Sequence, residues 1–145
     1  MKDILPADMY PDSRKLLVKH EDYRTKVYQD TNGDWTGGIG RNISTRAFSA
    51  DEIELMFSND VNENYSLLKS NLPWFETLNK ARQIALIDMS FMGWGRFLTF
   101  TEMLDALRRG DWKRAHDELL DSEYGEKERS RAFDLATILL TGVLP

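Results

Sequence analysis

The stretch from residue 21 to residue 40, EDYRTKVYQDTNGDWTGGIG, is the most informative part of this chain. It places Glu21, Asp30 and Thr36 nine and then six residues apart. An Asn-Gly pair at 32–33 is a strong signal for a hairpin turn, and the glycines that follow allow backbone conformations closed to other residues. The stretch therefore predicts a short hairpin or meander over residues 26–45, with Asp30 at its opening and Thr36 across from it.

Two carboxyl groups in different protonation states are the usual equipment for cutting a glycosidic bond. Glu21 ends the first predicted helix four residues after Leu17, so we expect its carboxyl on the buried side of that helix. The helix dipole and apolar surroundings would both favour the protonated acid there. Asp30 lies in a polar turn whose donors favour the ionised form, and Thr36 is placed to hold a water molecule together with Asp30.

Other chemistries find little support in the sequence. Asp30-x-Asn32-x-Asp34 resembles the start of a calcium-binding EF-hand loop, but Trp35 and Arg41 replace its glycine and its bidentate glutamate. The two histidines are far apart, and no cysteine is present, so neither a zinc site nor a thiolate nucleophile is predicted. The glycines lack the spacing of a phosphate-binding loop. We therefore expect no metal and no cofactor.

The composition predicts one globular domain spanning residues 1–145. The chain has 145 residues and an apolar fraction of 41%, and no apolar run is long enough to insert into a membrane. The N-terminus lacks the apolar segment of a signal peptide, so we expect a cytoplasmic location unless another protein releases the chain. A net charge of −5 argues against a nucleic-acid binder, and it makes long-range steering toward an anionic polymer unfavourable.

The predicted elements indicate a predominantly helical α+β fold, because only residues 26–45 favour strands. Residues 1–11 read as an arm before a first helix capped by Asp12 or Ser13. A capping box of Ser49 and Glu52 begins a long helix that ends near residue 70. Residues 79–91 are apolar on most faces and are expected to form the central buried helix. Further helices are expected from a Thr99 and Glu102 cap to Gly110, from an Asp111 cap to residue 120, and at 126–141 before Gly142.

Three side chains outside the hairpin are candidates for substrate contact. Phe91 and Trp94 belong to a group of aromatic residues between two predicted helices, where core packing is the default and a sugar-facing platform is the alternative. Arg131, at the start of the last helix, would pair with Glu21 if that helix lies beside the first. An ordinary surface arginine is the competing interpretation.

Residues 16–40, with the Glu-x8-Asp-x5-Thr spacing and the Gly-Ile-Gly ending, resemble the phage-type lysozymes, the T4-endolysin-like muramidases of glycoside hydrolase family 24. Residues 82–91, RQIALIDMSF, resemble the central helix of that family. A looser likeness continues through residues 100–107 and 130–142. The resemblance covers nearly the whole chain from about residue 12.

The resemblance implies two lobes bridged by a long helix, with an N-terminal lobe at about 12–60, a helical C-terminal lobe at about 70–145 and a cleft between them. It implies hydrolysis of the bond between N-acetylmuramic acid and N-acetylglucosamine in peptidoglycan. The anomeric centre would be inverted, which needs carboxyl groups about 6.5–9.5 Å apart. By position, Glu21 is the general acid, and Asp30 with Thr36 orients the water. Phe91 matches an aromatic residue of the cleft, Asn42 follows the hairpin at a sugar-contact position, and Arg131 matches the arginine that accompanies the acid.

The chain also departs from the family pattern. Arg41 stands where the typical member has histidine, so an ion pair there is either lost or replaced. The loop after Phe91 is shortened, and Met103, Glu118 and Glu123 differ from the typical side chains, which leaves the distal subsites undefined.

Two other functions remain open. A lytic transglycosylase needs no second carboxylate, so Asp30 and Thr36 argue against it. A non-catalytic wall-binding or virion module would keep the fold without the activity. For an active enzyme, the resemblance implies a monomer that waits in the host cytoplasm for a holin pore and then acts on the glycan strand of the wall.

Overall fold

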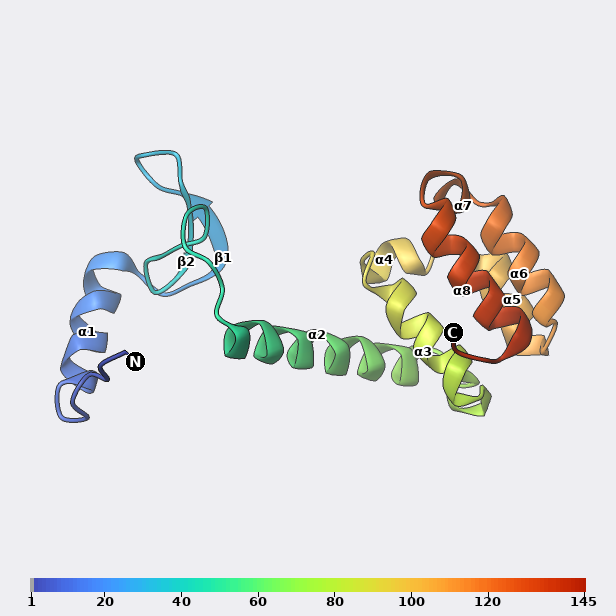
Figure 1. Cartoon of the computed structure of the whole chain (residues 1–145), viewed down its shortest axis with the longest axis horizontal. Helices are drawn as coiled ribbons and strands as arrows, with labels where there is room; N and C mark the ends of the chain where they lie inside the picture. Colours follow the sequence, from blue (N-terminus) through green and yellow to red (C-terminus); the bar gives the residue numbers. More distant parts are fainter. Residues whose placement is uncertain (1) are drawn as a thin grey trace. The chain divides into compact units, whose positions relative to one another are not determined.

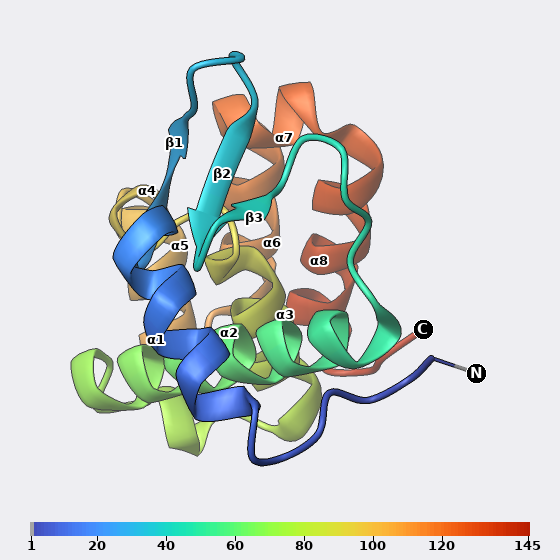
Figure 2. The ribbon, with the colours of Figure 1, turned by 90° about the vertical axis from the view of Figure 1, so that its left-hand side faces the viewer.

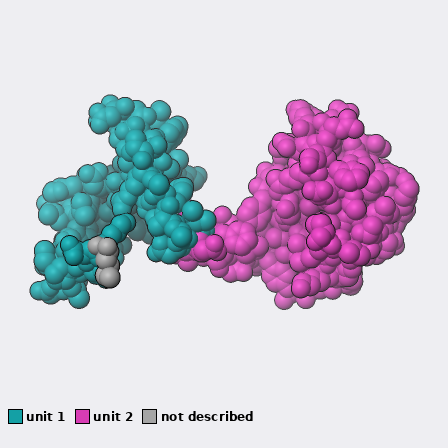
Figure 3. Space-filling model, viewed as in Figure 1, with its two compact units in different colours: residues 1–53 teal, residues 54–145 magenta. Residues whose placement is uncertain are grey.

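The computed structural model describes residues 2–145 and divides the chain into two compact units, one ending at Ile53 and one running from Glu54 to Pro145 (Figure 3). Eight α-helices, one 3-10 helix and one three-stranded antiparallel sheet lie within residues 2–145 (Figure 1). The predicted α+β class with a predominance of helix is therefore confirmed. The division into lobes at about 60 and 70 stays a prediction.

Unit 1 holds the sheet. It contains α1 (Tyr10–Glu21), β1 (Arg24–Gln29), β2 (Trp35–Gly38) and β3 (Arg41–Asn42). The strands lie in the order β1-β2-β3, and both pairs are antiparallel (Figure 2). Sequence reasoning placed this region at 26–45, which is close to the observed span.

The first helix differs from its prediction at its start and in its burial. It begins at Tyr10 with Met9 as N-cap, so the caps assigned to Asp12 or Ser13 are wrong. Pro11 lies in the first turn, where the missing N–H costs nothing because those N–H groups have no partner in the helix. No residue of α1 is buried in the described chain, and Leu17 is half exposed. The prediction that the Glu21 carboxyl lies on a buried side of this helix is therefore wrong within unit 1, because α1 covers no core there.

The long helix α2 (Ala50–Asn71) begins in unit 1 and continues into unit 2. The predicted capping box is confirmed: the Ser49 N–H donates to Glu52 Oε1 at 2.9 Å, and the Glu52 N–H donates to Ser49 Oγ at 3.4 Å. Each side chain thus satisfies a backbone donor that the helix itself leaves free.

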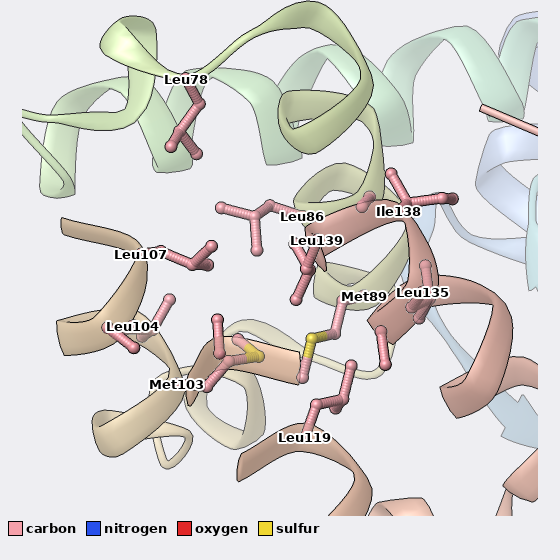
Figure 4. Close-up of a cluster of buried hydrophobic side chains, with 14 of the residues drawn as sticks. Leu78, Leu86, Met89, Met103, Leu104, Leu107, Leu119, Leu135, Ile138 and Leu139 are labelled. Carbon is pink, nitrogen blue, oxygen red and sulfur yellow. The ribbon is translucent and has the colours of Figure 1, made fainter. Parts of the chain in front are cut away.

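Unit 2 is helical and contains the core. After η1 (Phe75–Thr77) follow α3 (Lys80–Ser90), α4 (Trp94–Phe97), α5 (Thr101–Arg109), α6 (Trp112–Asp121), α7 (Glu123–Lys127) and α8 (Arg129–Thr141). Figure 4 shows side chains of α3, α5, α6 and α8 directed toward one another in the core. The fully buried members include Leu86, Met89, Leu107, Leu119 and Leu139. The prediction of α3 as a buried central helix agrees with this packing.

Two of the predicted helix boundaries in unit 2 are wrong. The Thr99 hydroxyl donates to the Arg96 carbonyl at 2.6 Å, and α5 begins two residues later with Phe100 as its N-cap. The predicted last helix is divided into α7 and α8, because Glu128 leaves the helical region at φ −116° and ψ 50°. The cap by Asp111, whose carboxylate accepts from the Arg114 N–H at 3.1 Å, is confirmed.

Arg82 ties the start of α3 to the end of α8. Its Nε donates to the Leu139 carbonyl at 2.8 Å and its Nη2 to the Leu140 carbonyl at 3.1 Å. The guanidinium lies 3.7 Å from the centroid of the Trp112 ring. Burial lowers the pKa of Arg82, and a cation suits this position because carbonyl oxygens at a helix C-terminus are negatively polarised.

Candidate active site

Glu21 is the last residue of α1, and its side chain packs directly against the backbone of Gly40. A Cβ atom added at Gly40 would lie 2.7 Å from Glu21 Cγ and 2.8 Å from Glu21 Cβ, closer than real carbon contacts. Gly40 also has φ +62°, a conformation that favours glycine. The glycine therefore allows the acid to lie against the end of the turn that connects β2 to β3.

Asp30 follows β1, and its carboxylate organises the hairpin turn. Its Oδ1 accepts the N–H groups of Asn32 and Asp34, each at 2.9 Å, and its own N–H donates to the Asp34 carbonyl at 2.8 Å. No partner of Oδ2 occurs among residues 2–145. One carboxylate oxygen is thus used to build the turn, and the other is available to a ligand.

Thr36 lies on β2 and is 5% exposed. The register of the sheet places Thr36 beside Tyr28 of β1 on one side and Asn42 of β3 on the other. Residues paired in this way have their side chains on the same face of a sheet. Thr36, Tyr28 and Asn42 therefore share one face.

Asn42 is itself held by hydrogen bonds within unit 1. Its Nδ2 donates to Asp34 Oδ2 at 3.1 Å, and its Oδ1 accepts from the Thr45 N–H at 3.0 Å. Asp34 is in turn connected to Asp30 through the turn. The amide is therefore fixed in orientation by the same hairpin that carries Asp30 and Thr36.

Arg41, which stands where the typical family member has histidine, makes an ion pair at this position. Its guanidinium pairs with the Glu52 carboxylate through Nη1, and Nη2 donates to the Ala47 carbonyl at 2.8 Å. It also lies 5.5 Å from the centroid of the Phe48 ring. These contacts connect β3 to the first turn of α2.

The other predicted site residues belong to unit 2. Phe91, 43% exposed, lies with its ring centroid 6.4 Å from that of Phe57. A hollow of about 330 Å³, with a mainly apolar lining, includes these two rings together with Asp88 and Arg131. Trp94 packs against Phe97, with ring centroids 5.4 Å apart, and lines an adjoining hollow of about 180 Å³ that also includes Phe91.

Arg131 is bound to Asp88 of α3. Its Nε and Nη2 donate to Asp88 Oδ1 at 3.0 and 2.8 Å, and Nη2 also donates to the Asp88 carbonyl at 3.0 Å. The hydrogen bond to Asp88 raises the pKa of Arg131. The pairing of Arg131 with Glu21 stays a prediction.

Sequence reasoning missed Asp88, Asp34 and the individual role of Gly40. Asp88 lies in a stretch whose apolar residues predict a buried helix, and its partner is 43 residues away, so no local pattern indicates the pair. Asp34 was considered only as a calcium ligand. Gly40 was one of a group of glycines, and its spacing from Glu21 gives no sign of their contact.

Residues 2–145 contain no group of three or more His, Cys, Asp or Glu side chains arranged to hold a metal ion. None of the helices described combines the length and the hydropathy needed to cross a membrane.

Comparison with known proteins gives a family. The model of the family described as phage lysozyme matches residues 18–133. The pre-baseplate central spike protein Gp5 of Enterobacteria phage T4 is 29% identical over 171 aligned positions, which cover 97% of this chain but 30% of the spike protein. The probable T4-type lysozyme 1 of Dictyostelium discoideum is 24% identical over 90% of this chain and 95% of its own length. These likenesses support a glycosidase of the lysozyme type, and the chain belongs to the phage lysozyme family.

Proposed function

We propose that the protein hydrolyses the β-1,4 bond between N-acetylmuramic acid and N-acetylglucosamine in bacterial peptidoglycan. The observation that carries the proposal is the packing of Glu21 against Gly40, in the turn that follows the strand holding Thr36, while Asp30 lies in the turn that precedes the same strand. All three groups belong to unit 1. Family membership supplies the reaction class.

In the proposed reaction Glu21 gives its proton to the glycosidic oxygen as the bond from that oxygen to the anomeric carbon breaks. A water molecule attacks the anomeric carbon from the opposite face and loses its proton to Asp30, whose Oδ2 is available. The Thr36 hydroxyl holds this water in place. Protonated Asp30 and ionised Glu21 then exchange protons with solvent, and the anomeric centre is inverted.

The residues proposed for substrate contact differ in how firmly they are held and in which group they offer to a sugar. Asn42 is fixed through Asp34 and Thr45, so its remaining N–H is available to a sugar in a defined direction. Phe91 offers a partly exposed ring for stacking on a sugar, and Trp94 lines the hollow beside it. Arg131, with Asp88 on one side of its guanidinium, keeps Nη1 for a further acceptor.

The decisive experiment replaces Glu21 by Gln, which keeps the size of the side chain and removes the proton donor. We expect activity on purified peptidoglycan to fall by at least about 1,000-fold, within the range for loss of a general acid. The matched control is Glu54→Gln, at an exposed position of α2, which should leave activity unchanged. Both variants should show the thermal unfolding midpoint of the parent. Parent-like activity in the Glu21 variant would remove the assignment.

Mass analysis of the released fragments separates the competing chemistries. A hydrolase releases fragments with reducing muramic acid ends. Proton NMR spectroscopy of the first product gives the configuration at the anomeric carbon. Ends containing 1,6-anhydromuramic acid would instead identify a lytic transglycosylase. Binding to sacculi without soluble fragments would identify a non-catalytic wall-binding module.

The biological setting of the activity has two candidates. Release from the host cytoplasm through a holin pore at lysis follows from the resemblance to phage endolysins. The likeness to a protein named as a central spike favours instead a role within the virion. Immunoblotting of purified particles and of the cytosol of infected cells before lysis distinguishes the two. Light scattering coupled to size-exclusion chromatography tests the proposed monomer.

A further inference from the structure

The backbone turns sharply at Asp22, the residue that follows Glu21. Asp22 has φ +66° and ψ 171°, and it is the one non-glycine residue with a positive φ among residues 2–145. This part of conformational space is almost restricted to glycine, because a Cβ atom is crowded by the neighbouring peptide groups. A glycine would adopt the same turn without strain. The aspartate therefore adds a backbone strain energy, which contacts of its side chain must offset.

The Asp22 carboxylate has a specific partner on the strand that leaves the turn. Arg24 Nη2 lies 3.2 Å from Asp22 Oδ2. The Arg24 guanidinium in turn lies 4.8 Å from the centroid of the Tyr28 ring, within the range of a cation–π contact. Asp22, Arg24 and Tyr28 thus form a continuous line of contacts, which we name the 22–24–28 clip.

The clip spans an irregular part of the sheet. Arg24 is paired with Gly38 and Tyr28 with Thr36, so four steps along β1 correspond to two steps along β2. Irregularities of this kind bend a strand and change the direction of the side chains near it. The Arg24–Tyr28 contact bridges the irregular segment, and its far end is the residue paired with Thr36.

Both ends of the clip adjoin proposed catalytic groups. Asp22 follows Glu21 directly in the chain. The backbone N–H of Asp22 donates to the Val18 carbonyl at 3.0 Å, which is the last hydrogen bond of α1. Tyr28 is two residues before Asp30 and shares a face of the sheet with Thr36. The clip therefore connects the acid to β1, which leads to Asp30 and pairs with the strand that carries Thr36, within unit 1.

We propose that Asp22 is a positioning residue, retained at a strained backbone site because its carboxylate, through Arg24 and Tyr28, fixes the orientation of Glu21 relative to Asp30 and Thr36. The inference rests on the proposed function. It accounts for an otherwise unfavourable residue at this turn, and it assigns a role to Arg24 and Tyr28. Strain of this kind persists where the surrounding contacts maintain it, often near an active site.

The test measures stability and turnover in the same full-length variants. Asp22→Gly removes both the strain and the clip, so the thermal unfolding midpoint should rise while kcat on peptidoglycan fragments falls about tenfold and KM changes less than about twofold. A residue with a purely structural role would move stability and activity in the same direction. Asp8→Asn, at an exposed position before α1, is the control and should change neither quantity.

A double-mutant cycle tests the route of the effect. Asp22→Asn and Arg24→Gln should each lower kcat, and the double variant should be no slower than the slower single variant, because both changes break the same contact. Additive losses would overturn the clip. Full turnover in Asp22→Gly, or a fall in its unfolding midpoint, would overturn the positioning role.

The two proposals fail in different ways. If the parent cleaves peptidoglycan, Glu21→Gln is inactive and Asp22→Gly is fully active, only the positioning role is wrong. If Glu21→Gln keeps its activity, the assignment of the acid is wrong and the positioning role is overturned with it.

Discussion

The side chain of Glu21 occupies the space in which Gly40 would carry a Cβ atom. The two residues are 19 positions apart in the chain, and the built Cβ would be 2.7 Å from Glu21 Cγ. The glycine is thus part of the candidate active site although it has no functional group. Its contribution is room for the acid.

Replacing Gly40 by alanine should therefore affect activity more than backbone strain alone explains. Gly38 is the matched control, because it has a similar φ of +59° but nothing within 4 Å of an added Cβ, whereas Gly40 meets Glu21. Both variants should lose about 1–2 kcal/mol of stability from the left-handed conformation. Only Gly40→Ala should also lower kcat, by about tenfold or more relative to Gly38→Ala. Equal activities in the two variants would contradict the packing role of Gly40.

Tyr124 should tolerate loss of its hydroxyl. The Tyr124 hydroxyl is buried and has no hydrogen-bond partner among residues 2–145. A buried hydroxyl without a partner costs desolvation free energy, so Tyr124→Phe should leave the free energy of unfolding unchanged or raise it by up to about 1 kcal/mol. Urea unfolding measures the change, with Tyr10→Phe at an exposed position as control. A loss of stability would show that the hydroxyl has a partner.

The same residue predicts a pH effect in alkaline solution. Burial raises the pKa of Tyr124 above its ordinary value of 10.0. Because burial disfavours the phenolate, Tyr124 leaves stability unchanged below pH 10, and stability falls as the pH rises from there through the folded-state pKa. Tyr124→Phe should therefore reduce the fall in unfolding free energy above pH 10, measured against the parent over the same range.

The stability of unit 2 should fall in acid as several of its carboxylates become protonated. The hydrogen bond from Arg108 lowers the pKa of Asp105, and Lys113 and Lys127 lower those of Asp117 and Glu123 in the same way. A lowered pKa contributes stability above the unfolded value, 3.8 for Asp, and this stability is lost as the pH falls through the folded-state pKa.

Asp105→Asn should consequently flatten the acid limb of the stability curve and lower stability at neutral pH. Thermal unfolding between pH 7 and pH 3 measures both effects, and Asp134→Asn on the exposed part of α8 is the control. An acid limb in the Asp105 variant that is as steep as that of the parent would exclude this carboxylate as a contributor.

Local patterns predicted those parts of the fold that depend on local physical chemistry. The Ser49 and Glu52 capping box and the Asp111 cap were correct because a cap is made by residues three apart in the chain. The hairpin was correct because its turn residues carry their own backbone preferences. The start of α1 was placed too late because Pro11 was read as the end of an arm rather than as part of a first helical turn.

Contacts between distant residues were beyond a local reading. The Asp88–Arg131 pair joins α3 to α8, and neither residue has a neighbour in sequence that indicates the other. The backbone conformation of Asp22 was equally hidden, because aspartate gives no signal for a turn that glycine normally makes. The predicted Thr99 cap was wrong because Thr99 lies two residues before α5 and its hydroxyl donates to the preceding Arg96 carbonyl.

The attachment of Arg82 to the end of α8 bears on how unit 2 forms during translation. Its two carbonyl acceptors lie 57 and 58 residues further along the chain, and α8 also supplies several core side chains, among them Leu135 and Leu139. Arg82 can make these two hydrogen bonds only after α8 has been synthesised. We expect the nascent helices of this unit to remain loosely associated until then, and the core to close in one late step.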